Sequence, residues 1–367
     1  MNIPVHDDWN AKIRQLPGAH FLQTKEWAEV KAEVGWRGEQ ISLHSPDGTV
    51  TAAAQLLIRR WRPFHVGPSI QIGYVPRGPL ADWNDPDIRV RMLAEMEKVA
   101  RKNKLVFVKI DPEIQVSSEP SLSQDRNQTS TAEAVIHLLR ERKWKYSLEQ
   151  VQFKNTMILN LNGDEASWLA RMKQKTRYNL RLAQKNGVTV RKATLEDLSL
   201  LYRMYAETAH RDGFIIRPES YYLNVWSKFI QAEMAEALIA EWEGIALAGL
   251  VMFIFANRAW YVYGMSTGEQ REKMPNYLLQ WEAMRIARQR GCVIYDLWGA
   301  PDHIDPSDPM YGVYRFKEGL GAEFVSTIGA WDFPIRPVLY FLYHQVIPRL
   351  LSITRLVRRK QIQQEVL

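Results

Sequence analysis

The chain has 367 residues, of which 46% are hydrophobic and 24% charged, which excludes a largely disordered protein and provides enough length for two domains. Its single cysteine, Cys292, excludes an intramolecular disulfide and a metal site built from several cysteines. The first eight residues have neither the basic nor the apolar region of a secretory signal, so we expect a cytoplasmic protein.

The net charge of +7 is concentrated in two segments. Residues 171–192 contain eight Lys or Arg residues and no acidic residue, and residues 336–367 contain six basic residues against Glu365. Concentrated positive charge suits a polyanion, such as a phosphate group, a nucleic acid or an anionic membrane. The alternative is that both segments are simply solvated basic helix faces.

Two stretches of the chain repeat one order of predicted elements. In the first they are extended residues 40–43, a turn at 47–48, a strand over 50–58, extended residues 70–76, a helix near 87–103 and a strand over 105–110. In the second they are residues 237–240, a turn at 243–244, a strand over 246–255, residues 259–263, a helix near 276–290 and a strand over 292–297. The pattern predicts an α/β (α+β) fold with a duplicated domain.

Between the copies the sequence predicts a polar loop over 116–132, and then four elements. These are a helix over 131–142, a strand near 156–161, a long basic helix over 165–186 and a helix over 195–212 that ends at Gly213.

The basic helix carries two faces. One is a stripe of cations spaced by four residues, Lys173, Arg177, Arg181 and Lys185. The other is the predicted core face, formed by Leu169, Met172, Leu180 and Ala183.

The C-terminal segment 337–360 is first apolar and then basic. Its apolar run is interrupted by His344, Pro348 and Arg349, so it is too short to span a bilayer. It fits a helix lying on a bilayer surface with its basic residues toward the headgroups. It fits equally a C-terminal helix packed on the body with a frayed basic end.

Several kinds of chemistry have no motif in the sequence. There is no phosphate-binding P-loop, no His-Glu-x-x-His and no Gly-x-Ser-x-Gly. We therefore expect no cofactor and no metal ion, and a substrate that arrives already activated.

Seven sets of residues between Phe21 and about Trp331 form an ordered pattern: 21–27 with 30–31, 77–79, 110–112, 175–181, 211–214 with 217–218, 260–264 and 314–319. In this order and at these separations, they resemble the Fem family of peptidoglycan aminoacyltransferases. The resemblance implies tandem acetyltransferase-like (GNAT-like) domains, with residues 1–153 completed by 320–336, residues 154–319, and a basic amphipathic helix over 337–367. Because the basic helix runs directly into Gly187, the chain resembles the members without a coiled-coil arm.

The resemblance also implies a reaction. An amino acid esterified to tRNA is transferred to an amine of the stem peptide of a muramyl precursor, which is UDP-linked or lipid-linked. The implied protein is a monomer without a cofactor, with a peripheral membrane contact through 337–360. The aminoacyl ester is already activated, which explains the missing ATP motif.

The resemblance assigns substrate-binding roles to four residues. Lys31 and Arg217 match family contacts to the diphosphate of the precursor, and cations suit phosphate oxygens. Tyr221 and Tyr263 match tyrosines that line the precursor groove. Each residue also has a structural alternative, such as an ion pair between Arg217 and Glu219.

Three further residues match positions near the reacting groups. Asp111 would orient the acceptor amine or take its proton. Lys317 would stabilise the developing oxyanion or the leaving ribose oxygen, with Phe316 stacked on a terminal base. The alternatives are a turn at Asp111 and a strand end with a surface lysine at Lys317. The basic stripe is the candidate contact to the tRNA backbone.

Three other functions fit parts of the same pattern. One is an acetyl-CoA-dependent N-acetyltransferase, although residues 271–276 lack the glycines of its pyrophosphate turn. Another is a non-catalytic tRNA-binding or membrane-binding protein. The third is aminoacyl transfer to a protein N-terminus or a lipid headgroup.

Overall fold

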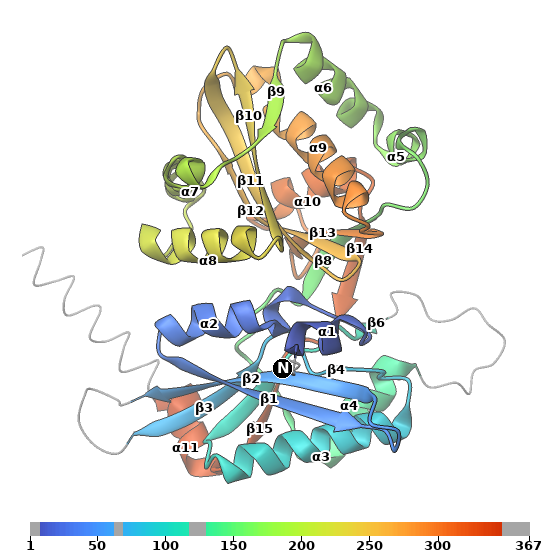
Figure 1. Ribbon diagram of the computed structural model, residues 1–367, viewed down its shortest axis with the longest axis vertical. Helices are drawn as coiled ribbons and strands as arrows, with labels where there is room; N and C mark the ends of the chain where they lie inside the picture. Colours follow the sequence, from blue (N-terminus) through green and yellow to red (C-terminus); the bar gives the residue numbers. More distant parts are fainter. Residues whose placement is uncertain (1–7, 62–68, 117–129, 347–367) are drawn as a thin grey trace, which may run out of the picture.

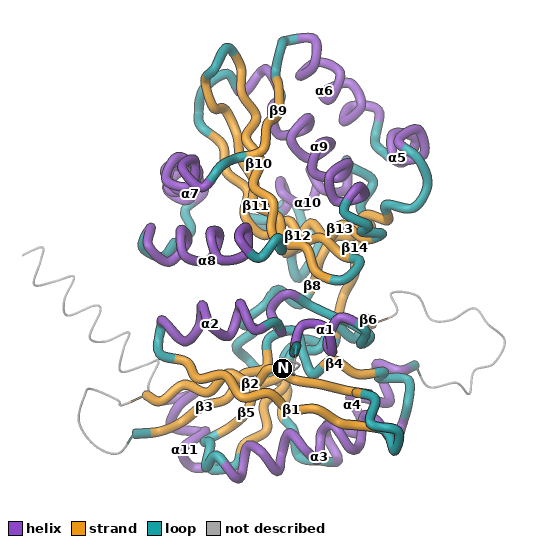
Figure 2. Tube along the Cα trace, in the orientation of Figure 1, coloured by secondary structure: helices purple, strands orange, loops and turns teal. Residues whose placement is uncertain are grey.

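The computed structural model describes residues 8–61, 69–116 and 130–346. Within these residues, two β-sheets lie one above the other along the long axis of the molecule, and helices cover both of them (Figure 1). Figure 2 shows the long strands of each sheet gathered in a separate half.

The first sheet has the strand order β1-β2-β3-β5-β15-β7, and β4 also pairs with β2. Of its neighbouring pairs, β3 and β5 run parallel and the others run antiparallel. The strands are β1 (Trp36–His44), β2 (Val50–Trp61), β3 (Ile70–Val75), β4 (Leu80–Ala81), β5 (Phe107–Ile110), β7 (Lys145–Tyr146) and β15 (Trp331–Pro334).

The second sheet has the order β9-β10-β11-β12-β13-β8-β14-β6. Here β12 and β13 are the parallel pair. The strands are β6 (Gln115–Val116), β8 (Asn155–Asn160), β9 (Thr189–Lys192), β10 (Ala235–Trp242), β11 (Ile245–Phe255), β12 (Arg258–Ser266), β13 (Ile294–Ala300) and β14 (Glu323–Thr327).

The described helices flank these sheets. They are α1 (Trp9–Arg14), α2 (Lys25–Glu33), α3 (Pro86–Lys102), α4 (Thr131–Glu141), α5 (Glu165–Arg171), α6 (Gln174–Lys185), α7 (Leu198–Asp212), α8 (Glu219–Gln231), α9 (Pro275–Gln289), α10 (Tyr311–Gly319) and α11 (Pro337–Phe341).

Both halves follow one plan. A long antiparallel hairpin, β1–β2 or β10–β11, is followed by a third antiparallel strand, β3 or β12. A helix, α3 or α9, then leads to a strand that pairs in parallel with the third one, as a parallel connection requires. This arrangement confirms the predicted α/β class and its internal repeat.

The two halves exchange short strands. β6 follows β5 in sequence but pairs with β14 in the second sheet, and β15 follows β14 but pairs with β5 in the first. Of the segment 320–336, which we expected to complete the first domain, residues 331–334 join the first sheet and residues 323–327 join the second.

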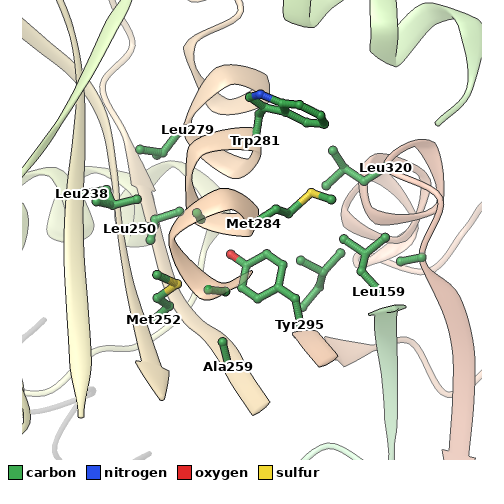
Figure 3. Close-up of a cluster of buried hydrophobic side chains, with 14 of the residues drawn as sticks. Leu159, Leu238, Leu250, Met252, Ala259, Leu279, Trp281, Met284, Tyr295 and Leu320 are labelled. Atoms are coloured by element: carbon green, nitrogen blue, oxygen red, sulfur yellow. The ribbon is translucent and has the colours of Figure 1, made fainter. Parts of the chain in front are cut away.

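One hydrophobic cluster crosses between the halves. It joins Phe21 and Trp27 of the first half to Trp226 and Phe253 of the second, all of them buried. Helix α2 packs against α8 at this boundary (Figure 1). On the opposite face of the second sheet, α9 packs its apolar side chains against the strands (Figure 3). The relative position of the halves is therefore fixed by apolar burial.

The predicted basic helix over 165–186 is wrong in one respect, because it is two helices. Met172 and Lys173 have extended backbones and separate α5 from α6. Met172 is buried in the core, and the Lys173 N–H donates to the Gly319 carbonyl, 2.9 Å away, so tertiary contacts replace the helical bonds here. The predicted end of α7 at Gly213 is confirmed by its left-handed backbone, with φ of 76°.

The described start of the C-terminal segment packs on the first sheet. Phe107 contacts the rings of Tyr340, Tyr343 and His344, and the Tyr340 hydroxyl donates to Asp332 at 3.0 Å. The predicted helix over 337–367 is thus a short helix, α11, followed by a wider π-helical turn over 342–346, and its remainder lies outside the described residues. Within the described ranges, no helix is both long and apolar enough to cross a membrane.

Candidate functional site

Two cations meet on one tyrosine where α2 faces α8. The Lys31 ammonium, from the first half, donates to the Tyr221 hydroxyl at 2.9 Å and lies 4.4 Å from the centre of the Trp27 ring. The Arg217 guanidinium, from the second half, lies 4.7 Å from the centre of the Tyr221 ring. The structure therefore brings together three of the predicted substrate-binding residues.

The electrostatics of this cluster favour an anion. Burial, followed by Arg217 and Arg59, lowers the pKa of Lys31 to about 8. Among the described residues, no carboxylate forms an ion pair with Lys31 or Arg217, and the alternative pairing of Arg217 with Glu219 does not occur. A bound phosphate or diphosphate would supply the missing negative charge.

Tyr263 lies behind this cluster. Its ring packs against those of Tyr205, Tyr222 and Trp226, at centroid distances of 5.6–5.7 Å. A β-bulge at Val262 interrupts the strand pairing, so Tyr263 and Tyr261 point to opposite faces of the sheet. Tyr263 therefore supports Tyr222, which itself packs against Tyr221.

A cavity of about 450 Å³ opens where β12 and β13 separate. The two strands pair only over 258–260 and 294–296, and beyond these residues both line the cavity. Helix α10 closes one side with Phe316 and Lys317. Phe316 packs against Tyr277 at a centroid distance of 5.2 Å. The structure thus places both predicted α10 residues in one pocket of the second half.

Lys317 is 5% exposed and lies in a helix, so the alternative of a surface lysine at a strand end is wrong. Its ammonium donates to the carbonyls of Trp298 and Gly299, at 3.1 and 2.5 Å. Burial lowers its pKa to about 8, against the field of Asp296. The ammonium has three N–H donors and these two acceptors among the described residues, which leaves one donor for the pocket.

Asp111 lies directly after β5 in the first half and is 3% exposed. One carboxylate oxygen accepts from the Tyr74 hydroxyl at 2.6 Å, and the other accepts from the Arg77 backbone N–H. Burial raises its pKa to about 6. Asp111 does not line the pocket of Lys317, and Arg77 lies between them, bonded to the Phe153 carbonyl at 2.9 Å.

The sequence did not predict a chain of charges that connects these sites. Arg77 lies 3.7 Å from Glu113, Glu113 pairs with Arg258 at 2.7 Å, and Arg258 pairs with Asp296. Only Arg77 carried a signal, because it belongs to one of the matching segments. The other three are isolated charges in segments far apart in sequence, so tertiary structure alone brings them together.

The predicted tRNA stripe begins beside α10 and leads away from it. Lys173 pairs with Glu318 of α10 at 2.7 Å, and the Arg177 guanidinium donates to the carbonyls of Leu169 and Met172. Arg181 and Lys185 are exposed and have no ion-pair partner among the described residues. Two of the four cations are therefore engaged within the protein.

No group of three or more potential metal-ligating His, Cys, Asp or Glu residues occurs in the part of the chain that the structure describes. The loop before α9 forms a short helical turn over 271–273, and Pro275 opens α9. Because residues 271–276 contain no glycine and Pro275 has no N–H to donate, this turn does not form the amide cradle of an acetyl-CoA-dependent enzyme.

Comparison with known proteins extends these observations. The model of the FemAB family matches residues 4–243 and 230–347. A lipid II:glycine glycyltransferase of Staphylococcus epidermidis is 24% identical over 428 residues, with 98% of each chain covered. A protein of the same name from Staphylococcus aureus is 25% identical over 426 residues, covering 97% of this chain and 99% of the relative.

Among solved structures, the crystal structure of FemX has a TM-score of 0.81 at 23% identity, and covers 94% of this chain and 99% of its own. The fold is therefore shared. The sequence alignments are longer than the 367 residues of this chain, so the relatives contain residues that it lacks. Here α6 ends at Lys185 and β9 begins at Thr189, which leaves no coiled-coil arm between them.

Proposed function

Because this chain belongs to the FemAB family, we propose that it transfers an aminoacyl group from aminoacyl-tRNA to the stem peptide of a peptidoglycan precursor. As a member of this family, the chain is an enzyme of the acyltransferase class. The observation that carries the proposal is the pair of cations, one from each half, that meets on Tyr221 without a carboxylate partner among the described residues.

This cation pair is the proposed binding site for the diphosphate of the acceptor. Lys31 offers a compact charge and Arg217 a planar fork, and both match phosphate oxygens. A diphosphate that touches both would also join the two halves, since Lys31 lies on α2 and Arg217 lies two residues before the start of α8.

The pocket between β12 and β13 is the proposed site of the aminoacyl ester. The acceptor amine forms a C–N bond to the ester carbonyl carbon, and the carbonyl oxygen becomes negative. The Lys317 ammonium stabilises this charge, or that of the ribose oxygen when the C–O bond breaks. Phe316 offers a ring on which a terminal base stacks.

Asp111 is the proposed acceptor of the proton that the amine loses, and it later releases this proton to water, while the leaving ribose oxygen takes a proton from water. Because Arg77 separates Asp111 from the pocket, the acceptor is proposed to approach Asp111 from the first half, on the side of Tyr74. The two substrates would then meet at the boundary between the halves, with one entering from each side.

The acceptor is proposed to be lipid-linked. The names of both staphylococcal relatives contain lipid II. In this chain the outer face of the C-terminal segment is apolar, with Val338 73% and Phe341 60% exposed. The sequence beyond it adds Arg349, Arg355, Arg358, Arg359 and Lys360. An apolar face followed by cations suits the surface of an anionic bilayer.

The transfer is tested with charged bulk tRNA and either UDP-linked or lipid-linked muramyl pentapeptide, with the product read by mass. A gain of one amino-acid residue supports the reaction and identifies the donor, with glycine as the first to try. Gain on the lipid-linked precursor alone supports the acceptor proposed here. No gain on either precursor contradicts the proposed function.

Membrane contact is tested by sedimentation with phosphatidylglycerol vesicles. Val338→Ser combined with Phe341→Ser should reduce binding, whereas Ile215→Ser should not, although Ile215 is 99% exposed. Equal binding of both variants would contradict a contact through this segment.

A further inference from the structure

Trp298 has an unusual backbone for a large residue. Its φ is 64°, in the left-handed region, where a non-glycine residue is disfavoured. This bend lies in β13 where the strand leaves its parallel partner, and it turns two consecutive carbonyls toward Lys317. The position of the ammonium therefore depends on whatever holds the bend.

The carboxylate of Asp296 holds it. One oxygen accepts from the Trp298 N–H at 2.7 Å and from the Thr156 hydroxyl, and the other pairs with Arg258. Asp296 is 1% exposed, so these bonds are formed without competition from water. The Asp296 carboxylate thus accepts from the N–H of Trp298, two residues later, and stabilises the left-handed backbone there directly.

The same carboxylate is tied to the first half. Arg258 forms ion pairs with both Asp296 and Glu113. Glu113 lies in the loop after β5, two residues beyond Asp111. Glu113 faces Arg77, and the Arg77 guanidinium lies 5.3 Å from the centre of the Trp298 ring. These contacts form a closed circuit that starts at the Trp298 N–H and returns to the Trp298 ring through Asp296, Arg258, Glu113 and Arg77. The circuit contacts both proposed reaction sites, because the Arg77 N–H donates to Asp111 and the Trp298 carbonyl accepts from Lys317.

We propose that the Asp296–Arg258–Glu113 chain positions Lys317, by fixing the Trp298–Gly299 bend and setting its place relative to the first half. Asp296, Arg258 and Glu113 are positioning residues that act through backbone carbonyls. The role of Lys317 in the reaction rests on the proposed function, but its placement by Asp296 does not.

A second buried ion pair provides a matched control. In the first half, Lys109 lies 3.2 Å from Asp332, and both are buried. The other side chains that reach the Asp332 carboxylate, Tyr340 and His344, belong to the C-terminal segment and not to β13 or α10. Asp296→Asn and Asp332→Asn therefore remove the same charge from similarly buried ion pairs, and only the first belongs to the circuit.

The experiment measures Lys317 in two ways. The first is acetylation by dilute acetic anhydride over a range of pH, read by mass at Lys317, which requires no substrate. The second is steady-state aminoacyl transfer. With the wild type, labelling should have a midpoint near the Lys317 pKa of about 8. Asp296 is the charged group that raises this pKa, while Lys173 and Glu318 pair with each other across α10 and α6.

Asp296→Asn should move the labelling midpoint to lower pH, because the charge that raises the Lys317 pKa is lost. It should also reduce kcat by about 100-fold with little change in KM, because the ammonium is misplaced while the substrates still bind. Asp332→Asn should change neither the midpoint nor kcat. An unchanged midpoint and an unchanged kcat in folded Asp296→Asn overturn the proposal. A shifted midpoint with an unchanged kcat is the effect of the lost Asp296 charge alone, and it also overturns the proposal that Asp296 positions Lys317 for the reaction.

If Asp296→Asn does not fold, Glu113→Gln tests the chain from its other end. It leaves the bonds of Asp296 to Trp298 and Thr156 intact and breaks only the tie to the first half. A reduced kcat at constant KM supports the proposal, and a wild-type kcat overturns it.

Discussion

The two halves of the molecule share one plan but end their parallel strand pair differently. In the first half, pairing of β3 with β5 reaches Val75 and Ile110, and Asp111 closes the end by bonding to Tyr74 and to the Arg77 backbone. In the second half, the strands separate after Trp260 and Asp296 and leave a cavity. The repeated fold therefore supplies one closed, charged end and one open end.

The difference extends to the buried lysines. Lys109 of the first half pairs with a carboxylate and also donates to Ser147. Lys317 of the second half is equally buried, but its acceptors among the described residues are backbone carbonyls. A paired lysine stabilises the fold, whereas a desolvated lysine that forms no ion pair within the described structure is arranged to meet a charge that comes from the substrate.

Replacing these two lysines should therefore have opposite consequences. Lys317→Met should lower kcat by about 100- to 1000-fold, because it removes a donor to the developing negative charge. Burial lowers the pKa of Lys317 to about 8 in the folded protein. Between pH 8 and the ordinary lysine pKa, the unfolded chain therefore binds more protons at this residue than the folded chain does. At neutral pH the charged Lys317 side chain thus disfavours the folded state relative to the unfolded state. Thermal unfolding of Lys317→Met at pH 7 should thus show no loss of stability.

Lys109→Met is the counterpart. It leaves the buried carboxylate of Asp332 unpaired and should reduce the free energy of unfolding by about 3–5 kcal/mol. The folded fraction should retain the wild-type kcat. Equal losses of kcat in the two variants would contradict the division between a structural and a catalytic lysine.

The pH dependence of kcat, measured at saturating precursor so that Lys31 with its own pKa of about 8 affects only KM, should contain one limb from each half. Asp111 acts as the carboxylate, so activity should rise with pH through its pKa of about 6. Lys317 acts as the ammonium, so activity should fall as pH passes its pKa of about 8. Asp111→Asn should lower kcat by about 100-fold and abolish the acid limb while the basic limb remains. Loss of the basic limb instead would reverse the assignment.

The cation pair belongs to both halves and should affect binding more than chemistry. Lys31→Met and Arg217→Met should each raise KM for the precursor about tenfold at constant kcat, as expected when one charge-assisted hydrogen bond to the substrate is removed. Tyr221→Phe removes only the hydroxyl that accepts from Lys31 and should have a smaller effect. A fall in kcat without a change in KM would show that the pair does not bind the acceptor.

Much of this arrangement could be predicted from local sequence signals. The hairpins, α3, α9 and the cap at Gly213 follow from apolar periodicity and turn residues. The pairing of β6 with the second sheet could not be predicted, because two residues carry no pattern that selects a sheet. The same limit explains the division of the basic helix at Met172, where core packing overrides helix propensity.

The site shows the same limit. The family resemblance assigned Lys31, Arg217 and Tyr221 to one substrate, and the structure places these three side chains in contact. The sequence pattern did not predict the β-bulge at Val262, which directs Tyr263 toward Tyr222, behind the Lys31–Arg217 cation pair. It also missed Asp296, whose side-chain partners Thr156 and Arg258 come from other strands, 140 and 38 residues away in sequence, so that only the folded chain reveals them.

The smallest expected effect concerns the basic stripe, most of which lies on α6 of the second half. Arg181 and Lys185 are the stripe cations without an ion-pair partner among the described residues, and removing one phosphate-binding cation should reduce the salt dependence of tRNA binding by a slope of about 0.7–0.9. Arg181→Ala and Lys185→Ala should therefore weaken binding modestly at low salt and hardly at all at high salt. Lys102→Ala, at the end of α3 in the first half, removes an equally exposed charge and is the control. Equal effects of all three variants would mean that tRNA responds to net charge, whereas an effect confined to α6 would place the donor on the second half, beside the open strand pair.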